Sequence, residues 1–214
     1  MSGKIVTIAQ QKGGSGKTTI AAHLAVAWAR RRGRTVAILD IDPQGSLGEW
    51  LEARERRLGE DATGLGFRTA SGWGSRHEAN ALARDYDYVL IDTPPKAEQD
   101  ARVAMDVCDL IVVPVQPTPV DLWATKATLK VAAGEDTPAI LVVNRMPSRA
   151  RLTGEMIEAL REFGPATASA RLGNRVSYAA SIGRGSTVIE DVPRSRAAEE
   201  IDALAEELLA CLRA

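Results

Sequence analysis

The sequence has few cysteines and no long apolar run. Cys108 and Cys211 are its only cysteines, too few for a disulfide framework, so reduced thiols in an intracellular compartment are expected. No stretch is apolar over the length needed to cross a bilayer, and no basic segment followed by an apolar stretch and a cleavage site opens the chain. These features argue against the disulfide-rich secreted and membrane-spanning classes, and they predict a cytoplasmic protein.

The chain also lacks a strong net charge. It has 27 Lys and Arg against 28 Asp and Glu, for a formal net charge of −1 at pH 7. A nearly neutral protein has no global attraction to nucleic acid or anionic lipid, so any such binding must use a local patch. A length of 214 residues suits one domain with a large core. No repeat or low-complexity linker divides the chain, so residues 1–214 are expected to form a single domain.

Apolar runs alternate with helical patterns along the chain. This alternation predicts an α/β fold, a mostly parallel twisted sheet with helices on both faces. Strands are expected at 5–9, 35–39, 88–91, 110–115 and 139–143, with an edge strand at 65–69 and a short strand near 166–170. Helices are expected from residue 20, at 46–54, 120–133 and 152–163, and at 195–212. The remaining weakly patterned stretch, 55–75, contains Trp73 between two glycines.

A glycine-rich loop, 11–19, lies between the first strand and the first helix. Its glycines leave no Cβ in the way, so backbone N–H groups can turn inward around an anion at the positive end of the helix dipole. Lys17 can reach the terminal phosphates of a nucleotide, and the Thr18 hydroxyl is placed to ligate Mg²⁺. The strict P-loop pattern is missed at Gln11, and the alternative is a glycine-rich turn with solvated lysines. The predicted nucleotide-binding residues here are Lys12, Gly13, Gly14, Ser15, Gly16, Lys17, Thr18 and Thr19.

Polar side chains directly follow three of the predicted strands. They are Asp40 and Asp42, Asp92, and Asn144, and ligands of open parallel sheets bind beyond these carboxyl ends. A carboxylate there costs desolvation unless it is paired, and Mg²⁺ with its water shell would pair with it. Asp92 is therefore interpreted as the Walker-B acid that orients the metal. Taken alone, it could equally cap a helix or bond within a turn.

With its second lysine, Lys12, the loop resembles the deviant Walker-A motif of the ParA/MinD group of P-loop ATPases. The resemblance implies ATP and Mg²⁺ as cofactors and an ATP-sandwich homodimer in which Lys12 acts on the partner's nucleotide. An arginine finger acts in trans in the same way. The alternative for Lys12 is a solvated loop lysine.

Further segments resemble the family's other signatures. Residues 38–45 resemble its second signature, which implies that Asp42 orients the attacking water, so the implied catalytic residues are Lys12, Lys17 and Asp42. The implied metal site is formed by Thr18, Asp42 and Asp92. Residues 141–145 resemble the adenine-reading strand end, which assigns Asn144 to the base. Residues 191–196 resemble the other base-contacting loop, which places Pro193 near the adenine.

The segment from residue 145 to residue 196 is rich in arginine. It contains nine arginines, Arg149 among them, and five acidic residues. A basic segment with small residues suits binding to a phosphate backbone. Residues 175–181 resemble the family's segment that bears a DNA-binding arginine, which maps to Arg175, and Arg184 is a second candidate contact. Both lie outside the nucleotide cluster in sequence. The alternative is solvated arginines on ordinary helices.

The resemblance implies a nucleoid-associated, ATP-dependent switch. Such a protein dimerises on ATP, binds double-stranded DNA non-specifically and segregates or positions a plasmid, chromosome or protein cluster, with hydrolysis stimulated by a ParB-like or cargo-adaptor protein. The alternative, a MinD-like membrane-associated positioning ATPase, needs a basic amphipathic C-terminal helix. The predicted helix 195–212 is acidic and would be repelled by anionic lipid, so we expect it to pack on the domain and expect no membrane partner. An iron–sulfur reductase would need more cluster thiolates than two isolated cysteines supply.

Overall fold

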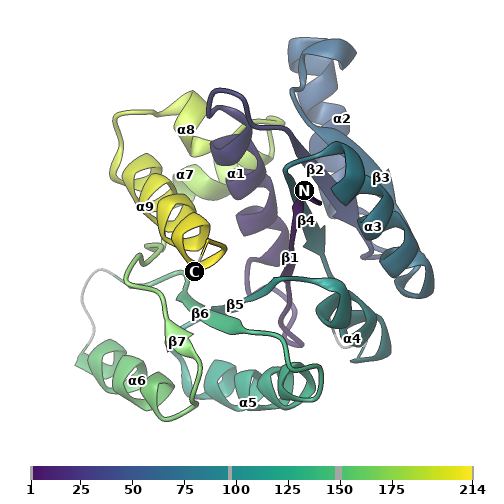
Figure 1. Ribbon diagram of the computed structural model, residues 1–214. Coiled ribbons are helices and arrows are strands. Elements are labelled where there is room, and N and C mark those ends of the chain that lie inside the picture. Colours follow the sequence, from purple (N-terminus) through teal and green to yellow (C-terminus); the bar gives the residue numbers. More distant parts are fainter. Residues whose placement is uncertain (1, 96–97, 148–150, 214) are drawn as a thin grey trace.

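The computed structural model describes residues 2–95, 98–147 and 151–213, and its central feature is a seven-stranded sheet (Figure 1). The strands are parallel and lie in the order β3-β2-β4-β1-β5-β6-β7. The first strand is central because it pairs with β4 on one side and β5 on the other. The loop that follows it therefore emerges at the middle of the sheet's carboxyl edge.

The elements have the following bounds. The strands are β1 (Lys4–Ile8), β2 (Val36–Asp40), β3 (Gly66–Thr69), β4 (Tyr88–Asp92), β5 (Leu110–Val115), β6 (Ala139–Val143) and β7 (Ala166–Thr167). The α-helices are α1 (Lys17–Ala29), α2 (Ser46–Leu58), α3 (Ser75–Asp85), α4 (Glu98–Val107), α5 (Pro119–Ala133), α6 (Arg151–Arg161), α7 (Val176–Ile182), α8 (Val188–Asp191) and α9 (Arg196–Cys211). Short 3₁₀ turns are η1 (Glu60–Ala62) and η2 (Gly72–Gly74).

Helices cover both faces of the sheet (Figure 1). One apolar cluster joins α1, α2, α7, α8 and α9 to one face, and a second joins α3, α4, α5 and α6 to the other. Successive residues of a strand point to opposite faces, so in β4 Leu90 belongs to the first cluster whereas Val89 and Ile91 belong to the second. The inner strands β2, β4, β5 and β6 are buried on both faces, which explains why they are apolar almost throughout rather than alternating.

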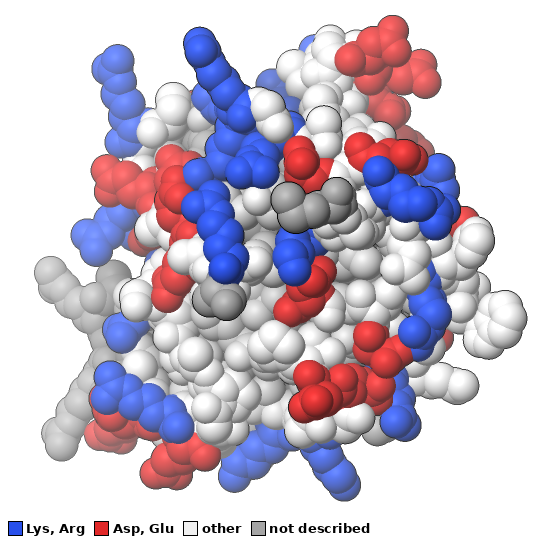
Figure 2. All heavy atoms as spheres, in the orientation of Figure 1, with Lys and Arg blue, Asp and Glu red and all other residues white. Residues whose placement is uncertain are grey.

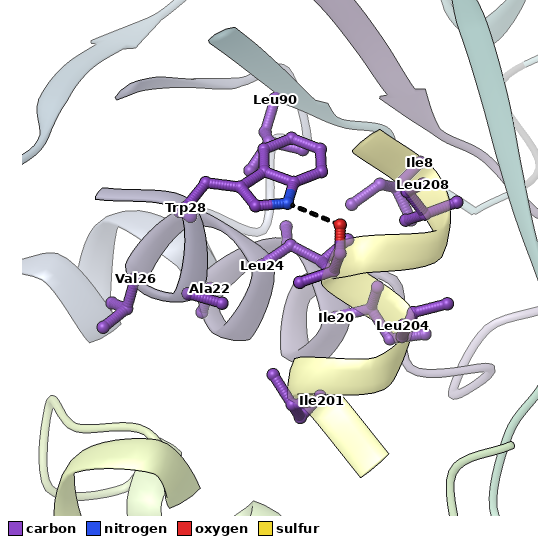
Figure 3. Close-up of a cluster of buried hydrophobic side chains, with 14 of the residues drawn as sticks. Ile8, Ile20, Ala22, Leu24, Val26, Trp28, Leu90, Ile201, Leu204 and Leu208 are labelled. Carbon is purple, nitrogen blue, oxygen red and sulfur yellow. Dashed lines mark hydrogen bonds between the residues drawn. The ribbon is translucent and has the colours of Figure 1, made fainter. Parts of the chain in front are cut away.

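The helices α1 and α9 pack against each other over the first face (Figure 3). Ile20 and Leu24 of α1 lie against Leu204 and its apolar neighbours on α9, all of them buried. The Trp28 indole N–H donates to the carbonyl of Ala205 at 3.1 Å, which satisfies a polar atom in an otherwise apolar contact. The apolar face of α9 is therefore covered by α1, and the prediction that the C-terminal helix packs on the domain is confirmed.

The predicted fold class and strands are confirmed, with differences in detail. The strand predicted near 166–170 covers only two residues, and α2 continues to Leu58 instead of ending at residue 54. Helices α3, α4, α7 and α8 were not predicted. The buried faces of α3 and α4 are made largely of alanines, such as Ala79 and Ala104, which give a weak apolar period.

Candidate nucleotide-binding site

The glycine-rich loop spans the gap between β1 and α1 at the carboxyl edge of the sheet. Gly14 and Gly16 adopt positive φ angles of 73° and 100°, a region that glycine enters without strain. A Cβ on Gly16 would also lie 2.2 Å from Nδ2 of Asn144. Backbone conformation and close approach therefore both require glycine at position 16.

Two side chains from neighbouring strand ends hold the carbonyls of this loop. Asn144 donates through Nδ2 to the Ser15 carbonyl at 2.7 Å, and Gln116 donates through Nε2 to the Gly14 carbonyl at 2.9 Å. In a trans peptide the following N–H points the opposite way, so the N–H groups of Ser15 and Gly16 point away from both side chains. These N–H groups make no backbone hydrogen bond within the described residues, and they are suited to bind an anion.

Thr18 and Asp92 meet at the first turn of α1. The Thr18 hydroxyl donates to Oδ2 of Asp92 at 2.6 Å, and Asp92 is fully buried. Burial raises the pKa of Asp92 to about 7, although the Thr18 hydrogen bond opposes the shift. Burial likewise lowers the pKa of Lys17, against the attraction of Asp92 and Asp42. A bound phosphate and cation would relieve both desolvated charges.

The residues at this junction fit a Mg²⁺ ion held jointly with a nucleotide. Oδ1 of Asp92 is buried and has no hydrogen-bond partner among the described residues, and the Thr18 hydroxyl lies beside the same carboxylate. In the described part of the chain, no group of three or more His, Cys, Asp or Glu is arranged to hold a metal by itself. A cation here would therefore depend on phosphate oxygens and water, as Mg²⁺ commonly does.

Asp40 ends β2 and Asp42 follows it, and the two serve different parts of the loop before α2. Asp40 is buried, and its carboxylate accepts hydrogen bonds from the backbone N–H groups of Asp42 and Gly48 at 3.0 and 3.3 Å. Burial nevertheless raises its pKa. Asp42 is only partly buried and accepts from the Gln44 N–H at 3.0 Å. Asp40 thus shapes the loop, and Asp42 is the carboxylate exposed at its surface.

Lys12 is held by a buried carboxylate on α5. Its Nζ lies 2.5 Å from Oδ2 of Asp121, whose side chain is fully buried, whereas the lysine side chain is 31% exposed. The Thr118 hydroxyl, which caps α5, also donates to Oδ2 of Asp121. Oδ1 of Asp121 has no hydrogen-bond partner within the described residues. Lys12 is therefore positioned at the rim of the loop instead of being freely solvated.

A buried polar network, which the sequence did not indicate, ties the start of the loop to α5. Gln10 donates through Nε2 to the Thr125 hydroxyl at 3.1 Å, and its Oε1 accepts from the Thr128 hydroxyl at 2.8 Å. The Gln11 N–H donates to the same Thr128 hydroxyl at 3.1 Å. Threonines inside a helix usually bond their own backbone, so no sequence signal marks this connection.

A cavity of about 320 Å³ opens beside Gly16. Its walls come from the start of α1, from Asn144 and Arg145, and from residues 172–179. Both polar atoms of the Asn144 side chain are engaged, since Oδ1 accepts from the Arg145 N–H at 2.8 Å. Asn144 thus shapes the wall nearest the loop. The cavity can accept the base of a nucleotide whose phosphates lie on the loop.

The structure does not test the predicted contact of Pro193 with the adenine. Pro193 lies exposed in the loop between α8 and α9 and does not line this cavity. Residues 172–176 form a further part of the wall, beside Asn144. The Leu172 N–H bonds to the Val143 carbonyl at 2.9 Å, next to Asn144. A short strand was expected near 166–170, but β7 ends at Thr167 and residues 172–176 do not follow it directly, so no strand-end signal marks them.

The arginines proposed to contact DNA are both in ion pairs. Arg175 Nη2 lies 2.6 Å from Glu200, and Arg184 Nη2 lies 2.6 Å from Asp191. Arg184 is well exposed at 59%, whereas Arg175 is 34% exposed and lines the cavity beside Gly16. Arg175 is distant from the phosphate loop in sequence but lies beside the cavity next to Gly16, whereas Arg184 does not line this cavity.

Charges of both signs alternate over the face shown in Figure 2, with several Lys and Arg side chains gathered above α1 and α8. Arg149 of the arginine-rich segment lies outside the described residues.

Among the helices of the described ranges, none combines the length and the apolar character that crossing a membrane requires.

Comparison with known proteins agrees with this geometry. Residues 6–190 match the CobQ/CobB/MinD/ParA nucleotide binding domain. The maintenance of carboxysome distribution protein A of Halothiobacillus neapolitanus is 30% identical over 95% of this chain and 95% of that protein. The chromosome-partitioning ATPase Soj of Thermus thermophilus is 30% identical over 96% of this chain and 95% of that protein. The septum site-determining protein MinD of Pyrococcus horikoshii, solved with Mg-ADP, superposes with a TM-score of 0.78 at 23% identity, covering 99% of this chain and 98% of that one.

The chain therefore belongs to the CobQ/CobB/MinD/ParA family of nucleotide-binding domains. It is a P-loop ATPase of the ParA/MinD group, as its loop motif predicted.

Proposed function

We propose that the chain is an ATP-driven positioning switch. It binds ATP with Mg²⁺, dimerises in that state, binds double-stranded DNA without sequence preference, and segregates or positions a cargo until a ParB-like or cargo-adaptor protein stimulates hydrolysis. The observation that carries the proposal is the position of Lys12. It is a second cation at the rim of the glycine-rich loop, whereas Lys17 is the buried cation inside the loop. A spare cation at this place can serve the nucleotide of a second protomer, as arginine fingers do.

The residues of the site divide the chemistry between them. Lys17 binds the terminal phosphates, and the N–H groups of Ser15 and Gly16 add hydrogen bonds from the loop. When bound, Mg²⁺ would supply positive charge to the phosphate oxygens, with Thr18, Asp92 and Asp42 around it. Asp42, the exposed carboxylate of its loop, orients the attacking water. Asn144 and residues 172–176 enclose the base.

The relatives' names support a positioning role and suggest the kinds of cargo. One is named for carboxysome distribution and another for chromosome partitioning, so a protein assembly and a chromosome are both candidate cargoes. A nucleoid-bound protein in the cytoplasm would use the arginine-rich segment, with Arg175 and Arg184 as its phosphate contacts. The membrane-associated alternative is disfavoured, because the apolar face of α9 lies against α1 and is not available to lipid.

Two variants test the switch. Lys12→Ala should bind ATP as a monomer but fail to dimerise or hydrolyse it, because the cation offered to the second protomer is gone. Asp42→Ala should bind ATP and remain dimeric, with turnover reduced by about 10²–10⁴-fold because the water is no longer oriented. Light scattering with ATP and a phosphate-release assay measure both properties.

Lys130→Ala, which removes an exposed lysine of α5, is the matched control and should behave as wild type. An unchanged ATP-dependent dimer with intact turnover in Lys12→Ala would refute the role of Lys12 in trans. Wild-type turnover in Asp42→Ala would move the catalytic role to another carboxylate.

A further inference from the structure

Trp73 is the most exposed of the large apolar side chains in the described part of the chain, at 88%. It lies in η2, between β3 and α3. Trp28 and Trp50 are buried, so a largely solvated indole is not the rule for tryptophan in this chain. Trp123 on α5 is the other exposed one, at 68%.

The turn that carries Trp73 is anchored at two buried residues, Gly72 and Ser75. The Ser75 hydroxyl donates to the Gly72 carbonyl at 2.6 Å, and Ser75 is fully buried. Gly72 packs so closely on α4 that a Cβ would lie 2.1 Å from Oδ1 of Asp100. A fixed backbone therefore presents an indole that contributes little to the chain's own core. Rigid, exposed aromatic side chains are typical anchors of protein–protein contacts.

A groove of about 690 Å³ runs from Trp73 to the loop that carries Asp42. Its lining includes Pro43, Gly45 and the carboxylates of Asp42 and Asp100. The ion pairs of the described residues include neither of these two carboxylates. The groove thus combines an aromatic end with two carboxylates that belong to no ion pair of the described residues, although Asp42 also attracts Lys17.

The second hollow beside Trp73 carries positive charge. Its volume is about 480 Å³, and its lining includes Arg84 and also Arg76, which forms an ion pair with Asp106. The charge of a ligand that approaches Trp73 therefore decides which hollow it enters. A cation is attracted to the groove that contains Asp42 and repelled from the hollow that Arg84 lines.

We propose that the groove between Trp73 and Asp42 docks an extended segment of a partner protein that carries a lysine or arginine next to an apolar side chain. The hydrocarbon stem of this lysine or arginine would pack on the Trp73 indole, and its cationic group would lie near Asp42 and Asp100. An occupant here touches the loop that holds the proposed water-orienting residue. The proposal thereby deepens the proposed function, on which it rests, by assigning a place and a chemistry to the activating partner.

A binding experiment with defined probes tests the site. The probes are a fluorescent nine-residue peptide of alternating leucine and arginine and the same peptide with glutamate for every arginine. Anisotropy titrations use the full chain without nucleotide. We expect only the arginine peptide to bind, and we expect Trp73→Ala to raise its Kd about thirtyfold, as truncation of an aromatic anchor commonly does. Asp100→Asn, which keeps the shape beside Gly72, should raise the Kd severalfold and flatten its salt dependence.

Trp123→Ala removes the other exposed tryptophan and is the matched control, with an expected Kd equal to that of wild type. Equal binding by wild type and Trp73→Ala, or equal binding of the two peptides, would overturn the proposal. Loss of the ATP-dependent dimer in Trp73→Ala would overturn it too, since Trp73 would then pair two copies of the chain. The titrations contain no nucleotide, so peptide binding is measured independently of ATP-driven dimerisation and DNA binding. Failure of the proposed function can therefore be distinguished from failure of the docking site.

Discussion

The phosphate loop and the arginine-rich C-terminal segment hold their charges in contrasting ways. Lys17 and Asp92 are buried at the junction of β1, β4 and α1, where each charge needs a specific partner to offset its desolvation. Arg175 and Arg184 are more exposed, and each is already neutralised by a carboxylate of its own chain. A surface arginine exchanges such a partner at little cost. A buried charge therefore indicates its function far more narrowly than an exposed one does.

The largest effect expected from this contrast belongs to Lys17. Lys17→Ala leaves the terminal phosphates without the internal cation, and truncating one member of a buried charge pair costs about 3–5 kcal/mol. We expect the affinity for ATP, measured by calorimetry with Mg²⁺, to fall by roughly two to four orders of magnitude. Lys130→Ala serves again as the exposed lysine control. Wild-type affinity in Lys17→Ala would mean that nucleotide does not bind on this loop.

The second prediction concerns the cost of burying Asp92 without a cation. Its folded-state pKa of about 7 lies above the ordinary 3.8, so this carboxyl progressively reduces stability as the pH rises from about 4 to about 7. Asp92→Asn keeps the shape and can still accept from Thr18, but it cannot ionise. We expect the nucleotide-free variant to be more stable than wild type above pH 7 by up to about 4 kcal/mol, and equal to it below about pH 4.

Urea unfolding at several pH values measures this difference. The control is Asp85→Asn at an exposed position, which should give a pH profile parallel to that of wild type. A parallel profile for Asp92→Asn as well would show that Asp92 does not carry a raised pKa. Turnover should be lost in Asp92→Asn even where stability rises, because the carboxylate proposed to orient the cation is gone.

The same contrast explains how much the sequence could predict. Thr18 and Asp92 are far apart in sequence, yet each lies in a motif or directly after a strongly apolar strand, and the carboxyl ends of parallel strands meet at one edge. Their hydrogen bond was therefore foreseeable from topology alone. The fold class followed from the same apolar strands, because burial on both faces leaves a continuous signal.

The interactions that escaped prediction lack such a signal. Asp121 lies 109 residues from Lys12 and belongs to no motif, so only the three-dimensional packing of α5 brings the two together. Residues 172–176 line the cavity beside Gly16 but do not directly follow β7, so the strand predicted near 166–170 carries no signal for them. Surface pairs such as Arg184 with Asp191 depend on loop conformation, which no period in the sequence encodes.

The smallest effects are expected at the proposed DNA contacts, where the two arginines should behave differently. Arg184 is exposed enough to exchange Asp191 for a phosphate, so Arg184→Ala should weaken binding to any duplex sequence alike. It should also reduce the slope of log affinity against log salt by about one for each phosphate that is no longer neutralised. ATP affinity should not change, because Arg184 does not line the cavity beside Gly16.

Arg175→Ala should have the same effect on DNA and should also alter ATP affinity, because its side chain forms part of that cavity. Arg161→Ala, an equally exposed arginine paired with Glu158 on α6, is the control and should leave the salt slope unchanged. Titrations at several salt concentrations, with and without a non-hydrolysable ATP analogue, separate these cases. Binding should need the analogue, since a dimer offers two patches to one duplex and a monomer only one. Unchanged slopes in both variants would remove the arginines from the interface, and absence of binding by the wild type would refute the nucleoid role.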